Sequence, residues 1–140
     1  MKRIFMLIVV AVVVVAFAPA VSAEDAKHPI DIELEKRIDA DSSTSGMIEA
    51  SQWAAGEWDK LLNQNYKALM QKLSKEQQAK LRASQSQWIK YRDLEFDFNA
   101  SFWAGFKGTM YRVMPAGFQC DFIRKRAQEL GEYLAGLDDM

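Results

Sequence analysis

The apolar positions of this chain follow a helical spacing from residue 47 onward. Between residues 47 and 73 they recur at i, i+3, i+4 and i+7, which is the pattern of a helix with one buried face. These positions are Trp58, Leu61, Leu62, Tyr66, Leu69 and Leu73. No proline interrupts the stretch, so we expect one long helix over 47–73, with Thr44 or Ser45 as its N-cap.

A second long helix is predicted immediately after the first. Ser74 and Gln77 fit a capping box, in which the serine oxygen accepts the backbone N–H of Gln77 and the glutamine side chain reaches back. The helix is expected to run from Lys75 to about Phe106, where two nearby glycines end it. Because the link between the two helices is so short, they are expected to form an antiparallel αα-hairpin.

Two further helices are expected on either side of this hairpin. Pro29 starts a short helix whose apolar residues are spaced by four, and the polar stretch 41–46 follows it as a loop. Pro115 is expected to open a C-terminal helix with alternating spacings of four and three. Its apolar seam consists of Ala116, Cys120, Ile123, Ala127, Leu130, Leu134 and Leu137. Since no strand-like alternation is present, we predict an all-α fold, a small antiparallel bundle of a long αα-hairpin plus a C-terminal third helix.

The N-terminus has the pattern of a secretory signal. A positive start, Met1-Lys2-Arg3, precedes the apolar run 4–18, and small residues lead up to Ala23. The run is shorter than the roughly 20 residues that cross a membrane. We therefore expect cleavage after Ala23, no stable membrane anchor afterwards, and a periplasmic or secreted product. The domains are then a signal peptide (1–23), an N-terminal segment with a short helix (24–46) and a helical domain (47–140).

Composition limits the partners and the chemistry. Cleavage removes two cations and no acid, so the net charge changes from −1 to −3. Mild acidity argues against nucleic acid and anionic membranes as partners and favours a basic protein only weakly. With one cysteine, Cys120, no internal disulfide can form, and its position in the apolar seam indicates a buried, inert thiol. One histidine, His28, lies far from it, so neither a zinc site nor any other cofactor is expected.

Polar residues interrupt the apolar faces of the predicted hairpin. They are Asp59, Asn63 and Tyr66 in the first helix, and Gln85, Trp88 and Arg92 in the second. Antiparallel pairing about Ser74 would place Asp59 opposite Arg92 and Asn63 opposite Gln85. We interpret this as a ladder that fixes the register of the hairpin, by a charge-assisted pair and by paired amides.

A catalytic role for these acids is not favoured. Asp59 or Asp93 could serve as a general base, but a carboxylate held by an arginine is a poor proton acceptor. Asp93, Glu95 and Asp97 alternate along a helix, so they point apart and cannot surround a metal ion. The common catalytic and phosphate-binding motifs are also missing, and we expect a protein that is not an enzyme.

The segment 96–114 is unusually aromatic. We expect most of it to pack as core beneath the C-terminal helix, and a remainder beside Arg112 to be exposed as a partner-binding patch, because such sites are rich in aromatics, Met and Arg. The candidate patch consists of Phe98, Phe102, Trp103, Phe106, Met110, Tyr111 and Arg112.

The motifs over residues 44–134 resemble those of the lysozyme inhibitor LprI-like family of bacterial exported proteins. The family-motif residues are Asp59, Leu62, Asn63, Tyr66, Gln85, Trp88, Arg92 and Asp93. The resemblance implies a helical envelope domain whose namesake inhibits lysozyme, and we interpret the motif as mainly structural. Many relatives carry two cysteines where this chain has Ala50 and Phe96, so the disulfide that those relatives form is absent here.

The sequence thus leaves two functions open. The first is an exported protein that binds and inhibits a lysozyme-like muramidase. The alternative is a periplasmic structural or adaptor module with another protein as its partner and no catalytic activity. The sequence does not determine the oligomeric state.

Overall fold

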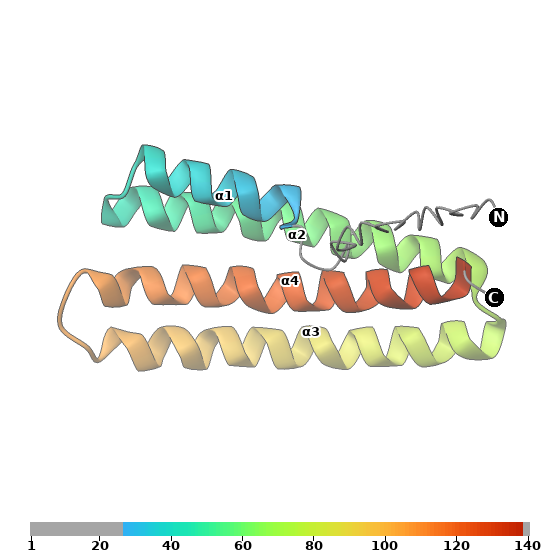
Figure 1. Ribbon diagram of the computed structural model, residues 1–140. Coiled ribbons are helices and arrows are strands. Elements are labelled where there is room, and N and C mark those ends of the chain that lie inside the picture. Colours follow the sequence, from blue (N-terminus) through green and yellow to red (C-terminus); the bar gives the residue numbers. More distant parts are fainter. Residues whose placement is uncertain (1–26, 139–140) are drawn as a thin grey trace, which may run out of the picture.

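The computed structural model describes residues 27–138, so the predicted signal peptide lies outside the described part. The four helices are α1 (Pro29–Ala40), α2 (Thr44–Lys72), α3 (Lys75–Ala104) and α4 (Met110–Asp138). Figure 1 shows them as one elongated bundle. The predicted all-α fold is confirmed. Over the same residues, no helix combines the length and hydropathy needed for a membrane span.

The cap of α2 lies one residue before the predicted candidates. Ser43 Oγ accepts the backbone N–H of Gly46 at 3.1 Å, and the helix begins at Thr44. Thr44 and Ser45 are therefore not the N-cap, which corrects that prediction. Asp41 decides the position, because its carboxylate accepts the N–H of Ser43 at 3.0 Å and so fixes the chain just before the helix.

The turn between α2 and α3 is held by the side-chain hydrogen bonds that the sequence predicts. Gln77 Oε1 accepts the N–H of Ser74 at 3.0 Å and Ser74 Oγ accepts that of Gln77 at 3.3 Å, so the predicted capping box is present. Gln78 Nε2 also donates to the carbonyls of Met70 and Leu73, each at 2.9 Å. These bonds satisfy carbonyls at the end of α2 that have no partner within the helix.

The α4 helix begins five residues earlier than predicted, at Met110 rather than at Pro115. The chain turns at Gly108, whose φ of 124° suits glycine. Pro115 then lies in the second turn of the helix. The first four N–H groups of any helix have no hydrogen-bond partner within the helix. Pro115 follows them and has no N–H, so α4 lacks one further backbone hydrogen bond.

The core forms mainly between α2 and α4, which run parallel, with α4 lying between α2 and α3 (Figure 1). The buried cluster consists of Ala54, Trp58, Leu62 and Leu69 from α2 and Cys120, Ile123, Ala127 and Leu130 from α4. The predicted seam of α4 is therefore confirmed as its buried face. Asn65 adds a polar link, because its Nδ2 donates to the carbonyl of Ala127 at 2.9 Å.

The short helix α1 covers one side of this core without contributing a fully buried residue. Its Ile30 and Leu34 pack against the cluster, and His28 lies over Trp58 with the ring centroids 4.4 Å apart. Asp31 reaches Arg124 of α4 at 3.4 Å. The helix thus seals the core of a bundle that α2 and α4 already define.

Candidate functional site

The predicted polar ladder between α2 and α3 is not formed. Asn63 Nδ2 donates within its own helix, to the carbonyl and the carboxylate of Asp59 at 2.8 and 3.1 Å. Arg92 donates to its neighbour Asp93, at 2.9 Å from Nε and 2.7 Å from Nη2. The pairing of Asp59 with Arg92 and of Asn63 with Gln85 was wrong because α4, and not α3, packs along α2.

The polar link that the structure does contain joins α3 to α4. Arg126 is only 8% exposed, and its Nε donates to the buried Gln85 Oε1 at 3.0 Å. Its other nitrogens reach Glu129 at 2.5 Å and Ser84 at 3.4 Å. Arg126 was not among the predicted site residues. An arginine directly before Ala127 of the seam was the available signal, since a cation at the edge of a buried face requires partners.

The other family-motif residues contribute to packing to different degrees. Leu62 is in the core, and Trp88 is half-buried and stacks on Phe122 with centroids 5.7 Å apart. The guanidinium of Arg92 lies 5.5 Å from the Trp88 ring, within cation–π range. Tyr66 is half-buried at the edge of the core, whereas Asn63 and Asp93 are exposed.

The aromatic segment is largely exposed, contrary to the expectation that most of it forms core. The exposed fractions are 61% for Phe98, 47% for Phe102, 46% for Phe106 and 58% for Met110. The reason is that α3 packs only against α4, so the opposite face of α3 has no covering helix. Phe96 is an exception and packs edge-on against Phe122 at 5.5 Å.

We call the exposed surface at the α3–α4 end the aromatic patch. It contains all the predicted partner-patch residues, of which Trp103 and Tyr111 are half-buried and the others exposed, namely Phe98, Phe102, Phe106, Met110 and Arg112. The structure thus brings the predicted residues together on two helices and the turn that joins them.

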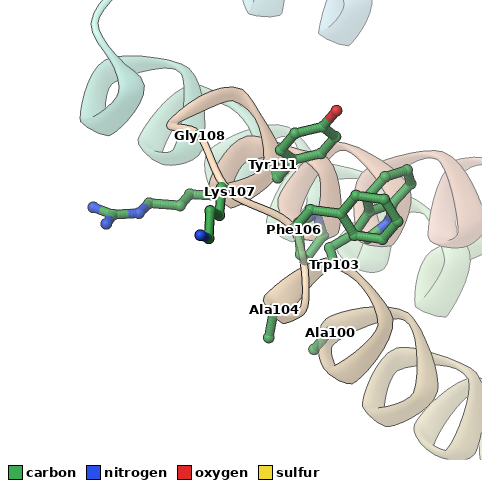
Figure 2. A pocket seen from close by; sticks show the side chains of 9 residues that line it. Ala100, Trp103, Ala104, Phe106, Lys107, Gly108 and Tyr111 are labelled. Carbon is green, nitrogen blue, oxygen red and sulfur yellow. The ribbon is translucent and has the colours of Figure 1, made fainter.

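The rings of the aromatic patch hold one another in place. Trp103 stacks on Tyr111 with centroids 5.7 Å apart and planes 17° apart, and Phe106 lies 5.0 Å from Tyr111. Figure 2 shows these three side chains at the turn, with Lys107 extending to the other side of the chain. The turn at Gly108 makes this stack possible, because it returns α4 against the end of α3. A shallow hollow results, which Lys107 and Arg112 also line.

The side chains of the aromatic patch offer non-covalent contacts through their rings, a methionine and an arginine. Its aromatics, methionine and arginine are the residue types enriched at protein-binding sites. Over residues 27–138, no group of three or more His, Cys, Asp or Glu side chains could hold a metal ion. Cys120 is buried at 4% exposure, and that burial, helped by the charge of Asp121, raises the pKa of its thiol to about 11. Such a thiol is a poor nucleophile near neutral pH.

Comparison with known proteins identifies a family and a structural likeness. The model of the family described as "Lysozyme inhibitor LprI" matches residues 36–130. The crystal structure of an uncharacterized protein from Burkholderia thailandensis has a similar fold, with a TM-score of 0.76 at 22% sequence identity. The alignment covers 81% of this chain and 57% of that protein, so this chain spans little more than half of its length. None of the curated proteins matches the sequence.

Proposed function

The chain belongs to the lysozyme inhibitor LprI family, and from this premise we propose that it is an exported inhibitor that binds a lysozyme-like muramidase through the aromatic patch. The observation that carries the proposal is the exposure of Phe98, Phe102, Phe106 and Met110 together at one end of the bundle. A contiguous apolar surface of this kind is typical of a site that a partner covers.

The energetics of the aromatic patch suit a protein partner. Covering a half-exposed phenylalanine stabilises a complex by on the order of 1 kcal/mol, and three such rings are available. The stacking of Trp103 on Tyr111 limits ring motion before binding, so less conformational entropy is lost in the complex.

The charged residues of this chain favour the active-site cleft of the muramidase as the surface that it binds. Glycosidases act through a pair of carboxylates that flank the scissile bond. Lys107 and Arg112, which line the same hollow as Trp103 and Tyr111, are the groups that would pair with those carboxylates. The net charge of −3 expected after cleavage also favours approach to a basic enzyme. We therefore propose that the inhibitor occludes the cleft and takes no catalytic part.

The direct test is a titration of residues 24–140 against lysozyme acting on a cell-wall suspension. We expect the rate of lysis to fall as the inhibitor approaches a stoichiometric amount. Undiminished lysis at a large molar excess would reject the proposal.

A double substitution, Phe98→Ser with Phe102→Ser, tests the assigned surface. Both rings lie on the open face of α3, so the helical circular dichroism should be retained while inhibition weakens about tenfold or more. Tyr133→Ser is the matched control, since Tyr133 is 58% exposed on α4 and lies outside the aromatic patch. Equal inhibition by the double variant and the control would assign binding to another face.

A further inference from the structure

A second recessed surface lies between α2 and α3, away from the aromatic patch. It is open to solvent and has a volume of about 540 Å³, and its lining residues are Asn63, Tyr66, Arg82, Gln85, Ser86, Ile89 and Lys90. We call it the α2–α3 groove. It exists because α4 separates the two helices, so the polar faces expected to pair with each other are left apart (Figure 1).

Several polar groups in the α2–α3 groove have no protein partner among residues 27–138. Asn63 uses its Nδ2 on Asp59, which leaves the oxygen of the same amide unused. Gln85 uses its oxygen on Arg126, which leaves its Nε2 unused. The amide of Gln85 is therefore oriented by a tertiary contact and that of Asn63 by its own helix, and both retain a free hydrogen-bonding end. The hydroxyls of Tyr66 and Ser86 add two more groups that both donate and accept.

The charged residues that line the α2–α3 groove are all basic. Arg82 and Lys90 line it, no acidic residue lines it, and neither cation forms an ion pair with a described residue. Other cations of the same helix are paired, for example Lys80 with Glu76 at 2.7 Å. The two groove cations are eight residues apart, which corresponds to about 12 Å along a helix. The groove is thus suited to an anionic ligand, which either cation can hold.

Apolar surface lies between these polar groups. The ring of half-buried Tyr66 and the side chain of Ile89, which is 39% exposed, face the same groove. A ligand that combines hydroxyl and amide groups with an apolar face and a carboxylate matches this lining. An acidic amino sugar combines these features.

We propose that the α2–α3 groove is a binding site for a short acidic saccharide, whose carboxylate is held by Arg82 or Lys90 and whose hydroxyl and amide groups bond to Asn63, Gln85 and Ser86. This site is separate from the aromatic patch, and the proposal does not depend on lysozyme inhibition. Binding here needs no rearrangement of the bundle, since the groove is open and Gln85 is already held by Arg126.

The experiment is calorimetric titration of residues 24–140 with two probes of equal length. The disaccharide of N-acetylglucosamine and N-acetylmuramic acid carries a carboxylate, whereas N,N′-diacetylchitobiose (chitobiose below) is neutral. We expect the acidic disaccharide to bind and chitobiose to bind at least about tenfold more weakly, the loss of one charge-assisted contact. No binding of the acidic probe, or equal binding of both probes, overturns the proposal.

Matched variants locate the site. Arg82→Gln with Lys90→Gln should weaken binding of the acidic disaccharide about tenfold or more, while Lys80→Gln on the same helix should leave it unchanged. All three side chains are exposed, so the fold should be retained, as circular dichroism will show. Unchanged binding by the double variant would place the sugar elsewhere. The same double variant should still inhibit lysozyme, which keeps this test separate from that of the aromatic patch.

Discussion

At the scale of single residues, burial determines which side chains can react. Cys120 would be a candidate nucleophile or dimerising thiol if it were exposed, but it lies in the α2–α4 core. Its pKa of about 11 is well above the usual value for a cysteine, because the buried site disfavours the thiolate. The thiol therefore contributes to packing as a small apolar group.

We predict that Cys120 is protected and that its protection depends on pH. At pH 8 a thiol-specific reagent should label the native protein at least about a hundredfold more slowly than the urea-unfolded chain. Because the pKa is raised on folding, the thiol's contribution to stability is complete below about pH 8.5, the pKa of an unperturbed cysteine. It is lost as the pH rises toward 11.

Denaturant unfolding at pH 8 and pH 10.5 tests this dependence. The stability of the native protein should fall more over this interval than that of Cys120→Ala, which cannot ionise at this position. Rapid labelling of the native protein at pH 8, or identical pH profiles for the two proteins, would contradict the assignment.

At the scale of elements, α4 is the helix that connects the others. It forms the core with α2 and carries the buried bond from Arg126 to Gln85 of α3. The two long helices that are adjacent in sequence are linked mainly at their turn, through the capping box and Gln78. Their relative positions are therefore set by α4 more than by each other.

We predict that double-mutant cycles will separate the observed link from the one expected from sequence. Arg126→Ala should cost about 2 kcal/mol or more of unfolding free energy, because it leaves Gln85 buried without its partner. The cycle of Arg126→Ala with Gln85→Ala should give a coupling of about 1 kcal/mol.

The control cycle pairs Asp59→Ala with Arg92→Ala, the ladder expected from the sequence. Its coupling should lie within about 0.3 kcal/mol of zero, since the two residues interact only with neighbours on their own helices. A coupling as large as that of Arg126 with Gln85 would show that α2 and α3 pack against each other in solution.

At the scale of the whole molecule, the three long helices form the core of the bundle and the short helix α1 is added to it. Helices α2, α3 and α4 contain every fully buried residue of the described chain, whereas α1 contains none. The family match over residues 36–130 covers α2 and α3 in full, most of α4 and only the end of α1.

We predict that a chain beginning at Asp41, which retains the cap of α2, remains helical and unfolds cooperatively without α1. Removing Ile30 and Leu34 from the core surface and His28 from Trp58 should lower Tm by roughly 5–15 °C. Thermal circular dichroism measures both properties. A broad, non-cooperative transition would show instead that α1 is required for the fold.

Local sequence signals were sufficient to predict the helices and several of their ends. The capping box at Ser74 depends on contacts within a few residues, and the seam from Ala116 to Leu137 is visible in the local spacing of apolar residues; both were correctly predicted. The start of α4 differs from the prediction because a proline in the second turn of a helix gives the same sequence signal as a proline at its first residue. The N-cap of α2 differs because it depends on the bond from the N–H of Ser43 to the carboxylate of Asp41, which apolar spacing does not reveal.

The sequence indicates which residues make up the aromatic patch but not how far each of them is exposed. The residues of the aromatic patch could be identified from their composition, since aromatics, Met and Arg cluster between residues 98 and 112. Periodicity cannot distinguish a face that meets another helix from one that meets solvent. Arg126 was missed for a similar reason, because its partner Gln85 lies 41 residues away in the chain.

The sequence by itself determined the all-α class, the approximate helices and the resemblance to the LprI family, because spacing, caps and motifs are encoded locally. Only the tertiary structure decided that α4 lies between α2 and α3 (Figure 1). That single choice leaves the expected ladder unformed, opens the α2–α3 groove and leaves the aromatic face of α3 uncovered. The physical reason is that apolar helix faces attract without directional preference, so which two faces meet depends on how all of them pack together.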